Sequence, residues 1–340
     1  MILVTGANGF LGTSLVRRLL DRGEKQIACL VRPGARKESL ESLAKGYPGA
    51  TVEVRNTGLT SPADIAPALE GVTLIYHLAA AMGGSPADMT MGTVVGSKNL
   101  LEAIARRKSE GHAPPRVVLV SSFGVYGVSD LPRGAMVDEN TPLEPAPEKR
   151  DTYSATKLRQ ERLFRDYERS LSLDLVIVRP GVIYGTGGGP MSSRVGLDVF
   201  GIFLNIGGQN RLPLTYVDNC ADATIFAGEK GKSGEVYNVV DDDLPTCNEY
   251  LAEYRRHLRK MPVLPVPYPM AQLLARGVSW YSAFSKGQLP AILTPYRTAA
   301  TWGGNRFDNS KLKGLGWSPV VSTSEGIART MEWHKAHPKK

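Results

Sequence analysis

The chain has 340 residues, of which 42% are hydrophobic and 22% charged, and its formal net charge is +8. A chain of this length and composition buries a sizeable core and is too apolar to be disordered. The basic residues are dispersed in short runs such as Arg17-Arg18 and Arg255-Arg256 without interleaved aromatics, so we expect solvated helix faces and no nucleic-acid partner.

The cysteines and the apolar segments indicate where such a protein works. Cys29, Cys220 and Cys247 have no paired spacing, so we expect no disulfide framework, no metal and a cytoplasmic location. An apolar strand begins at residue 2, so we expect no signal peptide. The apolar stretch 262–284 contains four prolines and Arg276, so we expect no membrane-spanning segment there, although it could touch a membrane surface or cover a hydrophobic substrate.

Short β-branched runs alternate with helical segments through the first half of the chain. Strands are predicted at residues 2–4, 27–31, 51–54, 73–77, 116–121 and 174–178, and helices at 11–22, at 89–107 and from 153 onward. Continuous apolar strands separated by helices are typical of a parallel sheet that is covered on both faces. We therefore predict an α/β fold, a Rossmann-type doubly wound parallel sheet.

The regular alternation ends after Arg179, where the glycine-rich loop 185–190 follows. We expect the doubly wound sheet to form one domain over residues 1–180, to which residues 212–245 return with a late strand at 235–240. Residues 181–211 and 246–335 are expected to form a smaller C-terminal substrate-binding lobe.

Three glycines lie between the first predicted strand and the first predicted helix. The first permits a tight turn, the second lets the backbone approach a pyrophosphate, and the third allows close packing of the helix. The N-terminus of the helix then offers free N–H groups and a positive dipole to the phosphates. The residues predicted to bind a dinucleotide here are Gly6, Asn8, Gly9, Phe10, Leu11 and Gly12.

Arg32 follows the second predicted strand, twenty residues after Gly12. An acidic side chain at this place binds the ribose hydroxyls of NAD, whereas an arginine accommodates the 2′-phosphate of NADP. Arg36 and Lys37 lie just beyond it in the same loop. We therefore predict NADP(H) as the cofactor, with NAD as the alternative.

Tyr153 and Lys157 lie four residues apart at the start of a predicted helix, so their side chains share one face. A nearby ammonium favours the phenolate, which would lower the pKa of Tyr153 and let it exchange a proton with a substrate oxygen. Ser122 ends the fifth predicted strand and is expected to hold that oxygen in place. We interpret the neighbouring Ser121 as a structural hydroxyl.

Taken together, these segments resemble the extended, epimerase/dehydratase-type short-chain dehydrogenases/reductases over nearly the whole chain. Besides the glycine turn and the three catalytic candidates, the likeness rests on 77–80, 125–127, 178–185, 216–219 and 315–319. It implies that Tyr153 is the general acid/base, that Ser122 orients the substrate, and that Lys157 also binds the nicotinamide ribose. Further cofactor contacts are implied for Leu78, Ala79, Ala80, Pro180, Gly181 and Val182. The resemblance also implies a homodimer through the helices near 89–107 and 153–169.

The chain departs from the family pattern at Gly58-Leu59, where Asp-Leu is usual, and at Thr93, where asparagine is usual. Ser122-Phe123-Gly124 replaces the Thr-Asp-Glu of the dehydratase branch, so sugar dehydration is not expected. Gly181 stands where nucleotide-sugar enzymes carry an asparagine.

The branch of the family sets the expected substrate. Segments 179–185 and 216–219 look more like 3-beta-hydroxysteroid dehydrogenases and dihydroflavonol reductases, which implies oxidoreduction of a small-molecule secondary alcohol or ketone. A nucleotide-sugar epimerase with tightly held NAD stays open as the alternative. Phe123 and Arg211 are the candidate substrate contacts, Arg211 through a phosphate. Aromatic residues Trp280, Tyr281 and Phe284 are expected mainly to pack in the core.

Overall fold

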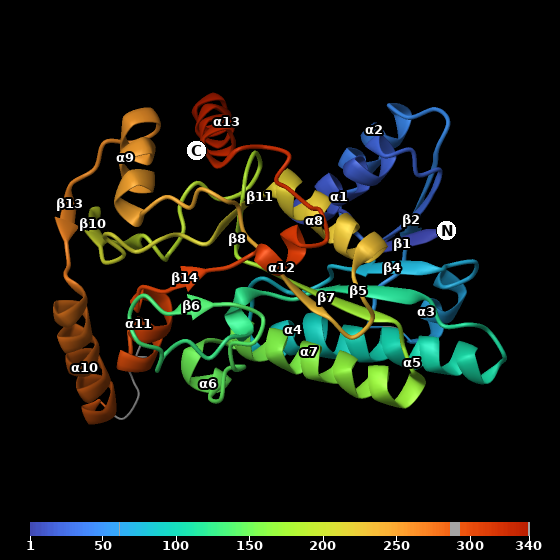
Figure 1. Ribbon diagram of the computed structural model, residues 1–340, viewed down its shortest axis with the longest axis horizontal. Helices are drawn as coiled ribbons and strands as arrows, with labels where there is room; N and C mark the ends of the chain where they lie inside the picture. Colours follow the sequence, from blue (N-terminus) through green and yellow to red (C-terminus); the bar gives the residue numbers. More distant parts are fainter. Residues whose placement is uncertain (61, 286–292, 339–340) are drawn as a thin grey trace.

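A seven-stranded sheet with strand order β12-β7-β5-β4-β1-β2-β3 is the central element of the computed structural model (Figure 1). The structure describes residues 1–60, 62–285 and 293–338. All pairings within this sheet are parallel. Its strands are β1 (Ile2–Thr5), β2 (Gln26–Val31), β3 (Thr51–Asn56), β4 (Leu74–His77), β5 (Arg116–Val120), β7 (Leu175–Pro180) and β12 (Val236–Val239).

Helices cover both faces of this sheet, and each face has its own hydrophobic core. Because successive strand residues point to opposite faces, Val4 packs into the core on one face of the sheet and Leu3 into the core on the other face. Figure 1 shows the two layers above and below the strands. The first layer holds α1 (Phe10–Asp21), α2 (Glu38–Lys45) and α8 (Val217–Lys230), and the second α3 (Pro62–Ala68), α5 (Gly96–Ser109) and α7 (Thr152–Leu171). The predicted doubly wound α/β fold is confirmed.

The helix predicted at 89–107 is interrupted near its start. It consists of α4 (Pro86–Thr90), a π-helical turn (Met91–Val95) and α5. In the π-helical turn the Thr93 hydroxyl accepts a 2.9 Å hydrogen bond from the backbone N–H of Ala81. The extra residue of such a turn reorients the chain, and here it brings Thr93 against the segment that follows β4.

The rest of the chain builds a lobe beside the carboxyl ends of the central strands. Its strands are β6 (Met136–Val137), β8 (Val182–Tyr184), β9 (Gly196–Val199), β10 (Ile202–Asn205), β11 (Leu214–Tyr216), β13 (Val263–Pro265) and β14 (Arg306–Phe307). Its helices are α6 (Pro147–Arg150), α9 (Cys247–His257), α10 (Tyr268–Phe284), α11 (Pro295–Trp302) and α13 (Thr323–Ala336). Helix α12 (Ser310–Lys313) instead packs beside β12, and its Leu312 belongs to the core of the first helix layer. Residues 286–292, which fall within the predicted substrate lobe, lie outside the described residues.

The segment 216–219 joins the lobe to the central sheet. The buried Asp241 carboxylate accepts hydrogen bonds from the Asn219 amide at 2.8 Å and from the Tyr216 backbone N–H at 3.0 Å. Burial nevertheless raises the pKa of Asp241 to about 6. Asn219 also donates to the Val321 carbonyl, so this segment connects three parts of the chain. The polar residues of this motif therefore have a structural role here.

Helix α10 does not pack Trp280, Tyr281 and Phe284 into the core, so that expectation was wrong. Trp280, Tyr281 and Phe284 are 69%, 50% and 72% exposed, whereas Ala271 and Ala275 on the opposite side are buried. The helix therefore packs Ala271, Ala275 and the partly buried Tyr268 against the lobe and presents its three later aromatic side chains outward. No helix within residues 1–60, 62–285 and 293–338 is long and apolar enough to cross a membrane.

Candidate active site

The glycine turn lies between β1 and α1 with a geometry that requires glycine. Gly6 has φ +68°, and a Cβ atom on Gly12 would lie 2.2 Å from the Gly6 carbonyl oxygen. Gly9 caps α1 without a side chain, so no side-chain oxygen occupies the first N–H groups of the helix. These free donors and the helix dipole fit the diphosphate of a dinucleotide.

The loop after β2 lies against this turn. The Asn8 amide donates a 3.4 Å hydrogen bond to the backbone carbonyl of Arg36. Arg32 is exposed directly after the last residue of β2. The loop therefore carries its basic side chains beside the turn, where the adenosine ribose of a bound dinucleotide is expected.

The end of β4 approaches the same turn. A Cβ atom on Gly6 would lie 3.1 Å from both the nitrogen and the Cα of Ala79, and the Ala79 N–H donates to the Thr5 hydroxyl at 3.2 Å. The predicted contacts Leu78, Ala79 and Ala80 thus follow a strand whose end is fixed beside the glycines.

Gly181 has a packing reason for being glycine. A Cβ atom there would lie 2.1 Å from the Pro213 carbonyl oxygen, and no side chain fits that space. The backbone N–H of Gly181 donates to Val239, and that of Val182 donates to Pro213 at 2.6 Å. The segment from Pro180 to Val182 is therefore fixed between β12 and β11, and the absence of asparagine follows from this close approach.

Ser122 and Tyr153 meet at the carboxyl end of β5. The Ser122 hydroxyl caps a short 3-10 helix (Phe123–Val125) by accepting a 3.0 Å hydrogen bond from Gly124, and it also hydrogen-bonds the Tyr153 side chain. Tyr153 is the second residue of α7, whose N-cap Asp151 accepts from the Ser154 N–H at 2.7 Å. The cap therefore fixes the turn of α7 that carries Tyr153.

Lys157 is buried below these two residues and is held by two acceptors. Its ammonium donates to the Val120 backbone carbonyl at 2.6 Å and to the Gln160 side-chain oxygen at 2.6 Å. Burial lowers the pKa of Lys157 to about 7, and the charge of Glu161 opposes part of this shift. The side chain is thus poised to change its charge near neutral pH.

The pKa of Tyr153 differs from the expectation. Burial raises it above its ordinary value, the hydrogen bond from Ser122 lowers it, and the charge of Asp151 raises it further. The ammonium of Lys157 is instead engaged by Val120 and Gln160. In this structure the phenol is therefore kept protonated, which suits a proton donor.

A buried polar network behind Lys157 escaped the sequence analysis. Gln160 donates to the Ser97 hydroxyl at 2.8 Å and to the Ala79 carbonyl at 3.3 Å. The His77 ring lies 2.9 Å from both the Thr5 and the Ser97 hydroxyls, and its burial lowers the pKa of His77 to about 3, so the ring is neutral. The signal in the sequence was a polar residue three positions after Lys157 on the same face of α7.

Ser121 has the structural role that we expected. Its hydroxyl donates a 2.7 Å hydrogen bond to Glu161, whose carboxylate also pairs with the buried guanidinium of Arg179. The Arg179 guanidinium lies 4.7 Å from the centre of the Tyr126 ring. These buried hydrogen bonds and ion pairs connect β5, β7 and α7. Ser121 is therefore engaged in the core, and Ser122 is the serine that faces Tyr153.

The two candidate substrate contacts, Phe123 and Arg211, lie in different surroundings. Phe123 is 4% exposed and its ring stacks on Phe307 at 5.6 Å, because the 3-10 turn directs it into the lobe core. Arg211 donates to the Leu244 carbonyl at 2.7 Å and lies 3.7 Å from Glu249. It lines an open pocket of about 960 Å³, none of whose lining residues belongs to the glycine turn or to the Ser122–Tyr153–Lys157 cluster.

The chain is similar in sequence to a family of known enzymes. A model described as the NAD dependent epimerase/dehydratase family matches residues 2–240. The N-acetyl-alpha-D-glucosaminyl-diphospho-ditrans,octacis-undecaprenol 4-epimerase of Escherichia coli O157:H7 is 26% identical, and the alignment covers 100% of this chain and 96% of the relative. The 3-beta-hydroxysteroid dehydrogenase of Mycolicibacterium neoaurum is also 26% identical, over 98% of this chain and 91% of the relative.

The solved structures show the same fold. The UDP-glucose 4-epimerase of Thermus thermophilus, in complex with NAD, superposes with a TM-score of 0.70 and 24% sequence identity, covering 99% of both chains. The relatives thus include both a dehydrogenase and an epimerase.

Proposed function

Because the chain belongs to the NAD-dependent epimerase/dehydratase family, we propose that it is an NADP(H)-dependent oxidoreductase that interconverts a secondary alcohol and a ketone. The observation that carries the proposal is the meeting of Ser122 and Tyr153 above the anchored Lys157 at the end of β5. A bound nicotinamide would supply the hydride acceptor or donor. The protein supplies the proton, the orientation and the charge.

Tyr153 is the general acid/base of this proposal. Its phenol, held protonated by burial, donates a proton to the oxygen of a ketone during reduction and takes it back during oxidation. The Ser122 hydroxyl, which already bonds the phenol, positions the same substrate oxygen. Lys157 places a titratable charge below them and is expected to bind the nicotinamide ribose.

We assign the cofactor preference to Arg32. Its exposed guanidinium follows β2, in a loop that Asn8 holds beside the glycine turn. A guanidinium binds a phosphate through two parallel hydrogen bonds to charged oxygens. Its interaction with a neutral ribose hydroxyl is weaker. This favours NADP(H), with NAD as the alternative.

Nucleotide-sugar epimerisation is the second candidate. The full-length similarity to the Escherichia coli epimerase favours it. An epimerase oxidises and then reduces one carbon with the same cofactor molecule, so it must retain that cofactor. Phosphate binding by Arg211 would require this side chain to leave Leu244 and Glu249.

Two measurements on the purified protein test the assignment. Mass spectrometry of the purified protein should detect either no bound nucleotide or NADP that exchanges with added cofactor. Bound NAD that survives purification would favour the epimerase. Turnover is then followed by nicotinamide absorbance over a panel of ketones and secondary alcohols. Tyr153→Phe should reduce it by about 100-fold or more and leave cofactor binding nearly intact, with Tyr167→Phe on the same helix as the matched control. Full activity of Tyr153→Phe would contradict the proposed role.

We also propose a cytoplasmic homodimer. The free and buried thiols of Cys29, Cys220 and Cys247 support a reducing compartment. Helices α5 and α7 lie side by side along one edge of the molecule (Figure 1) and are the surface expected to pair. Since Lys98, Arg106 and Arg162 are exposed or partly exposed there, such an interface would be polar and its dissociation sensitive to salt.

A further inference from the structure

Helix α10 has the reverse of the polarity expected for a helix on a water-exposed surface. Ala271 and Ala275 are buried on its inward face beside the partly buried Tyr268, while Leu273 and Trp280 are each 69% exposed. The single charged residue of the helix is Arg276. A helix in water turns its large apolar side chains toward the protein. The arrangement of α10 suits a helix whose outward neighbour is itself apolar.

A second segment presents apolar side chains in the same way. The turn between β9 and β10 carries Phe200, which is fully exposed and has φ +52°, a conformation that bulky residues rarely adopt. Val199 and Ile202 pair directly across this hairpin and are 39% and 47% exposed. A phenylalanine is thus displayed at the tip of a tight turn where glycine or asparagine would be the usual choice.

These two segments form one continuous surface. Strand β13 pairs with β10 so that Leu264 lies beside Leu204, and the chain then enters α10 three residues after β13. The partly buried Leu197 and Leu204 pack against the core cluster that contains Ala271 of α10. We call this surface the apolar face; it consists of Val199, Phe200, Ile202, Leu264, Met270, Leu273, Leu274, Val278, Trp280, Tyr281 and Phe284.

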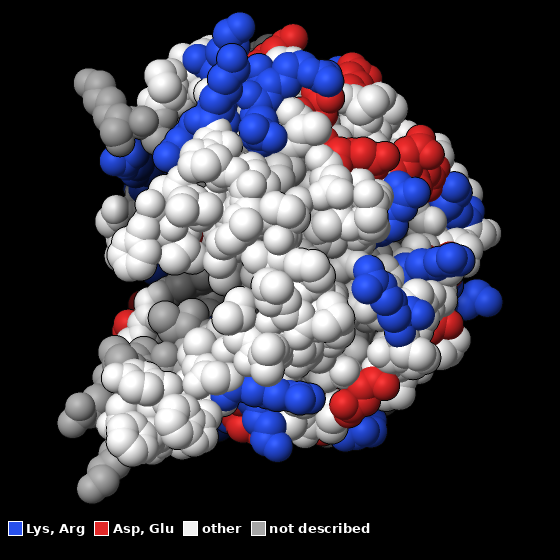
Figure 2. Space-filling model, turned by 90° about the vertical axis from the view of Figure 1, so that its left-hand side faces the viewer, with Lys and Arg blue, Asp and Glu red and all other residues white. Residues whose placement is uncertain are grey.

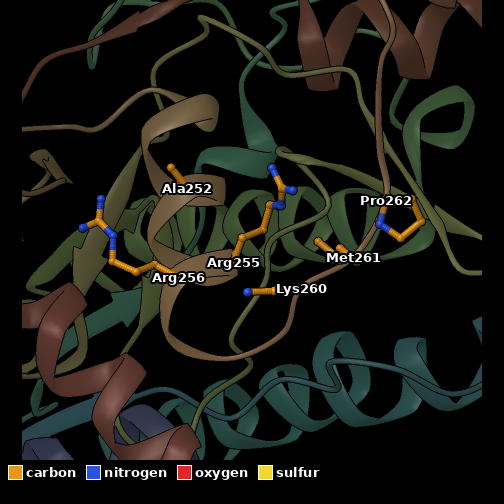
Figure 3. A pocket seen from close by; sticks show the side chains of 6 residues that line it. All are labelled: Ala252, Arg255, Arg256, Lys260, Met261 and Pro262. Atoms are coloured by element: carbon orange, nitrogen blue, oxygen red, sulfur yellow. The ribbon is translucent and has the colours of Figure 1, made fainter.

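Basic side chains gather at one edge of the apolar face. Figure 2 shows the broad uncharged area and the group of Lys and Arg side chains beside it, at the end of the molecule where α9 lies. Arg255, Arg256 and Lys260 line an open pocket of about 550 Å³ around the end of α9 (Figure 3). The carbonyl of Pro262, which also lines this pocket, accepts a 3.0 Å hydrogen bond from the Phe203 N–H of β10, so the basic group adjoins the sheet of β9, β10 and β13.

These cations are only partly neutralised by the protein. Arg256 lies 2.7 Å from Glu253, and Arg259 lies 3.8 Å from Asp198. Within the described residues, neither Arg255 nor Lys260 has a carboxylate within ion-pairing distance. Their charges are therefore available to an anionic partner beside the apolar face.

We propose that the apolar face and its basic edge bind the surface of a bilayer that contains anionic phospholipids. An interfacial helix places leucines and phenylalanines at the acyl boundary and aromatic rings such as those of Trp280 and Tyr281 near the headgroups. Basic residues such as Arg255 and Lys260 then contact the anionic headgroups. Helix α10 has 17 residues, a length of about 25 Å, so it lies along the surface and does not span it.

A bilayer matches this surface better than a second copy of the chain does. It offers an apolar layer and negative charge side by side, which are the two features that the face complements. A symmetric contact between two copies would bury the aromatic residues. It would offer the basic edge only the same uncharged and basic surface of the other copy, and no anionic partner. Membrane binding is independent of the proposed chemistry, because the apolar face contains no residue of the glycine turn or of the Ser122–Tyr153–Lys157 cluster.

The test uses the full chain and vesicle flotation. Binding to phosphatidylcholine vesicles that contain phosphatidylglycerol should exceed binding to phosphatidylcholine alone and should fall with added salt. The double variant Arg255→Glu/Lys260→Glu should remove this difference, a loss of about fivefold or more for each charge. The double variant Leu273→Glu/Trp280→Glu should bind either vesicle more weakly by about tenfold or more. Val320→Glu, which alters an exposed apolar residue outside the face, serves as the matched control.

Two further measurements give each outcome one meaning. Indole fluorescence should shift to the blue when vesicles are added to the wild type, and Trp280→Phe should lose most of that shift while it still floats with the vesicles. Absence of flotation, or flotation equal to that of the wild type in Leu273→Glu/Trp280→Glu, would overturn the proposal. A dimer in light scattering that this variant dissociates, without vesicle binding by the wild type, would assign the face to a second copy.

Discussion

The ammonium nitrogen of Lys157 lies 2.6 Å from the backbone carbonyl oxygen of Val120, the last residue of β5. This hydrogen bond joins the helix that carries Tyr153 to the strand that leads into Ser122. The position of Tyr153 relative to Ser122 is therefore set by a hydrogen bond between a buried side chain of the helix and the backbone of the strand. Enzymes that depend on such positioning lose activity when it is displaced by as little as an ångström.

Gln160 should act as a positioning residue for Lys157. Gln160→Leu removes one of the two described acceptors of the ammonium, so the charged form is less stable and the pKa of Lys157 falls further below about 7. We expect kcat to fall by about 10- to 100-fold, with a larger loss at high pH. Gln160→Glu keeps an acceptor and adds a negative charge, so it should move the alkaline limb upward. The measurement is kcat/KM against pH for both variants. An equal loss at every pH would show that Gln160 only supports the fold.

Adjacent serines at the end of β5 should have separable effects. Ser122→Ala removes the hydroxyl that bonds Tyr153, and we expect kcat to fall by about 100-fold with little change in stability. Ser121→Ala removes a donor from the buried Glu161 carboxylate, which should lower the free energy of unfolding by about 1–3 kcal/mol. Steady-state kinetics and denaturant unfolding of both variants check this contrast. The assignment fails if Ser121→Ala is the more damaging change for kcat of the folded enzyme.

The sheet and the glycine turn were predictable because their signals are local. A strand, a turn of fixed spacing and a helix follow one another within residues 2–21, and Tyr153 and Lys157 share a helix face by spacing alone. The partners of Lys157 were not predictable in this way. The position of Gln160 among Ser97, Ala79 and His77 depends on how α7 meets α5 and the end of β4.

Orientation also decided where the sequence-based predictions were wrong. An apolar helix such as α10 has the same composition whether its large side chains are buried or exposed, and only its small residues Ala271 and Ala275 indicate the buried side. Phe123 follows Ser122 directly, and the 3-10 turn, which the sequence does not predict, directs its ring toward Phe307. For α10 the hydrophobicity was predicted correctly, but the side on which its large residues lie was not.

Arg32 should determine the choice between the two dinucleotides. Arg32→Glu removes the cation proposed to bind the 2′-phosphate and supplies a carboxylate for ribose hydroxyls. We expect the Kd for NADPH to rise by about tenfold or more, since a hydrogen bond to a charged group contributes about 1.5–3 kcal/mol, and the Kd for NADH to fall. Fluorescence titration of both reduced cofactors measures this. Arg329→Glu, on an arginine whose side chain is 47% exposed on α13, is the matched control. Tighter binding of NADH than of NADPH by the wild type would contradict the assignment.

His77 should make the stability of the protein depend on pH in mild acid. Burial lowers the pKa of His77 from 6.5 to about 3, so below about pH 6.5 the unfolded chain binds a proton that the folded chain does not. The stabilisation is fully present above the unfolded pKa and is lost as the pH falls from about 6.5 toward 3. Between about pH 7.5 and pH 5 this one group should lower the free energy of unfolding by about 2 kcal/mol.

The variant that isolates this effect is His77→Asn. An amide at this position keeps polar atoms between Thr5 and Ser97 but has no proton to gain, so any loss of stability from altered packing is the same at both pH values. Guanidinium unfolding of wild type and variant at about pH 7.5 and pH 5 therefore gives a difference of differences in which the other titrating groups cancel. That quantity should be close to about 2 kcal/mol, with the variant less sensitive to acid than the wild type. An equal acid sensitivity of the two proteins would mean that the His77 ring accepts a proton within the fold, and the neutral network behind Lys157 would then be wrong.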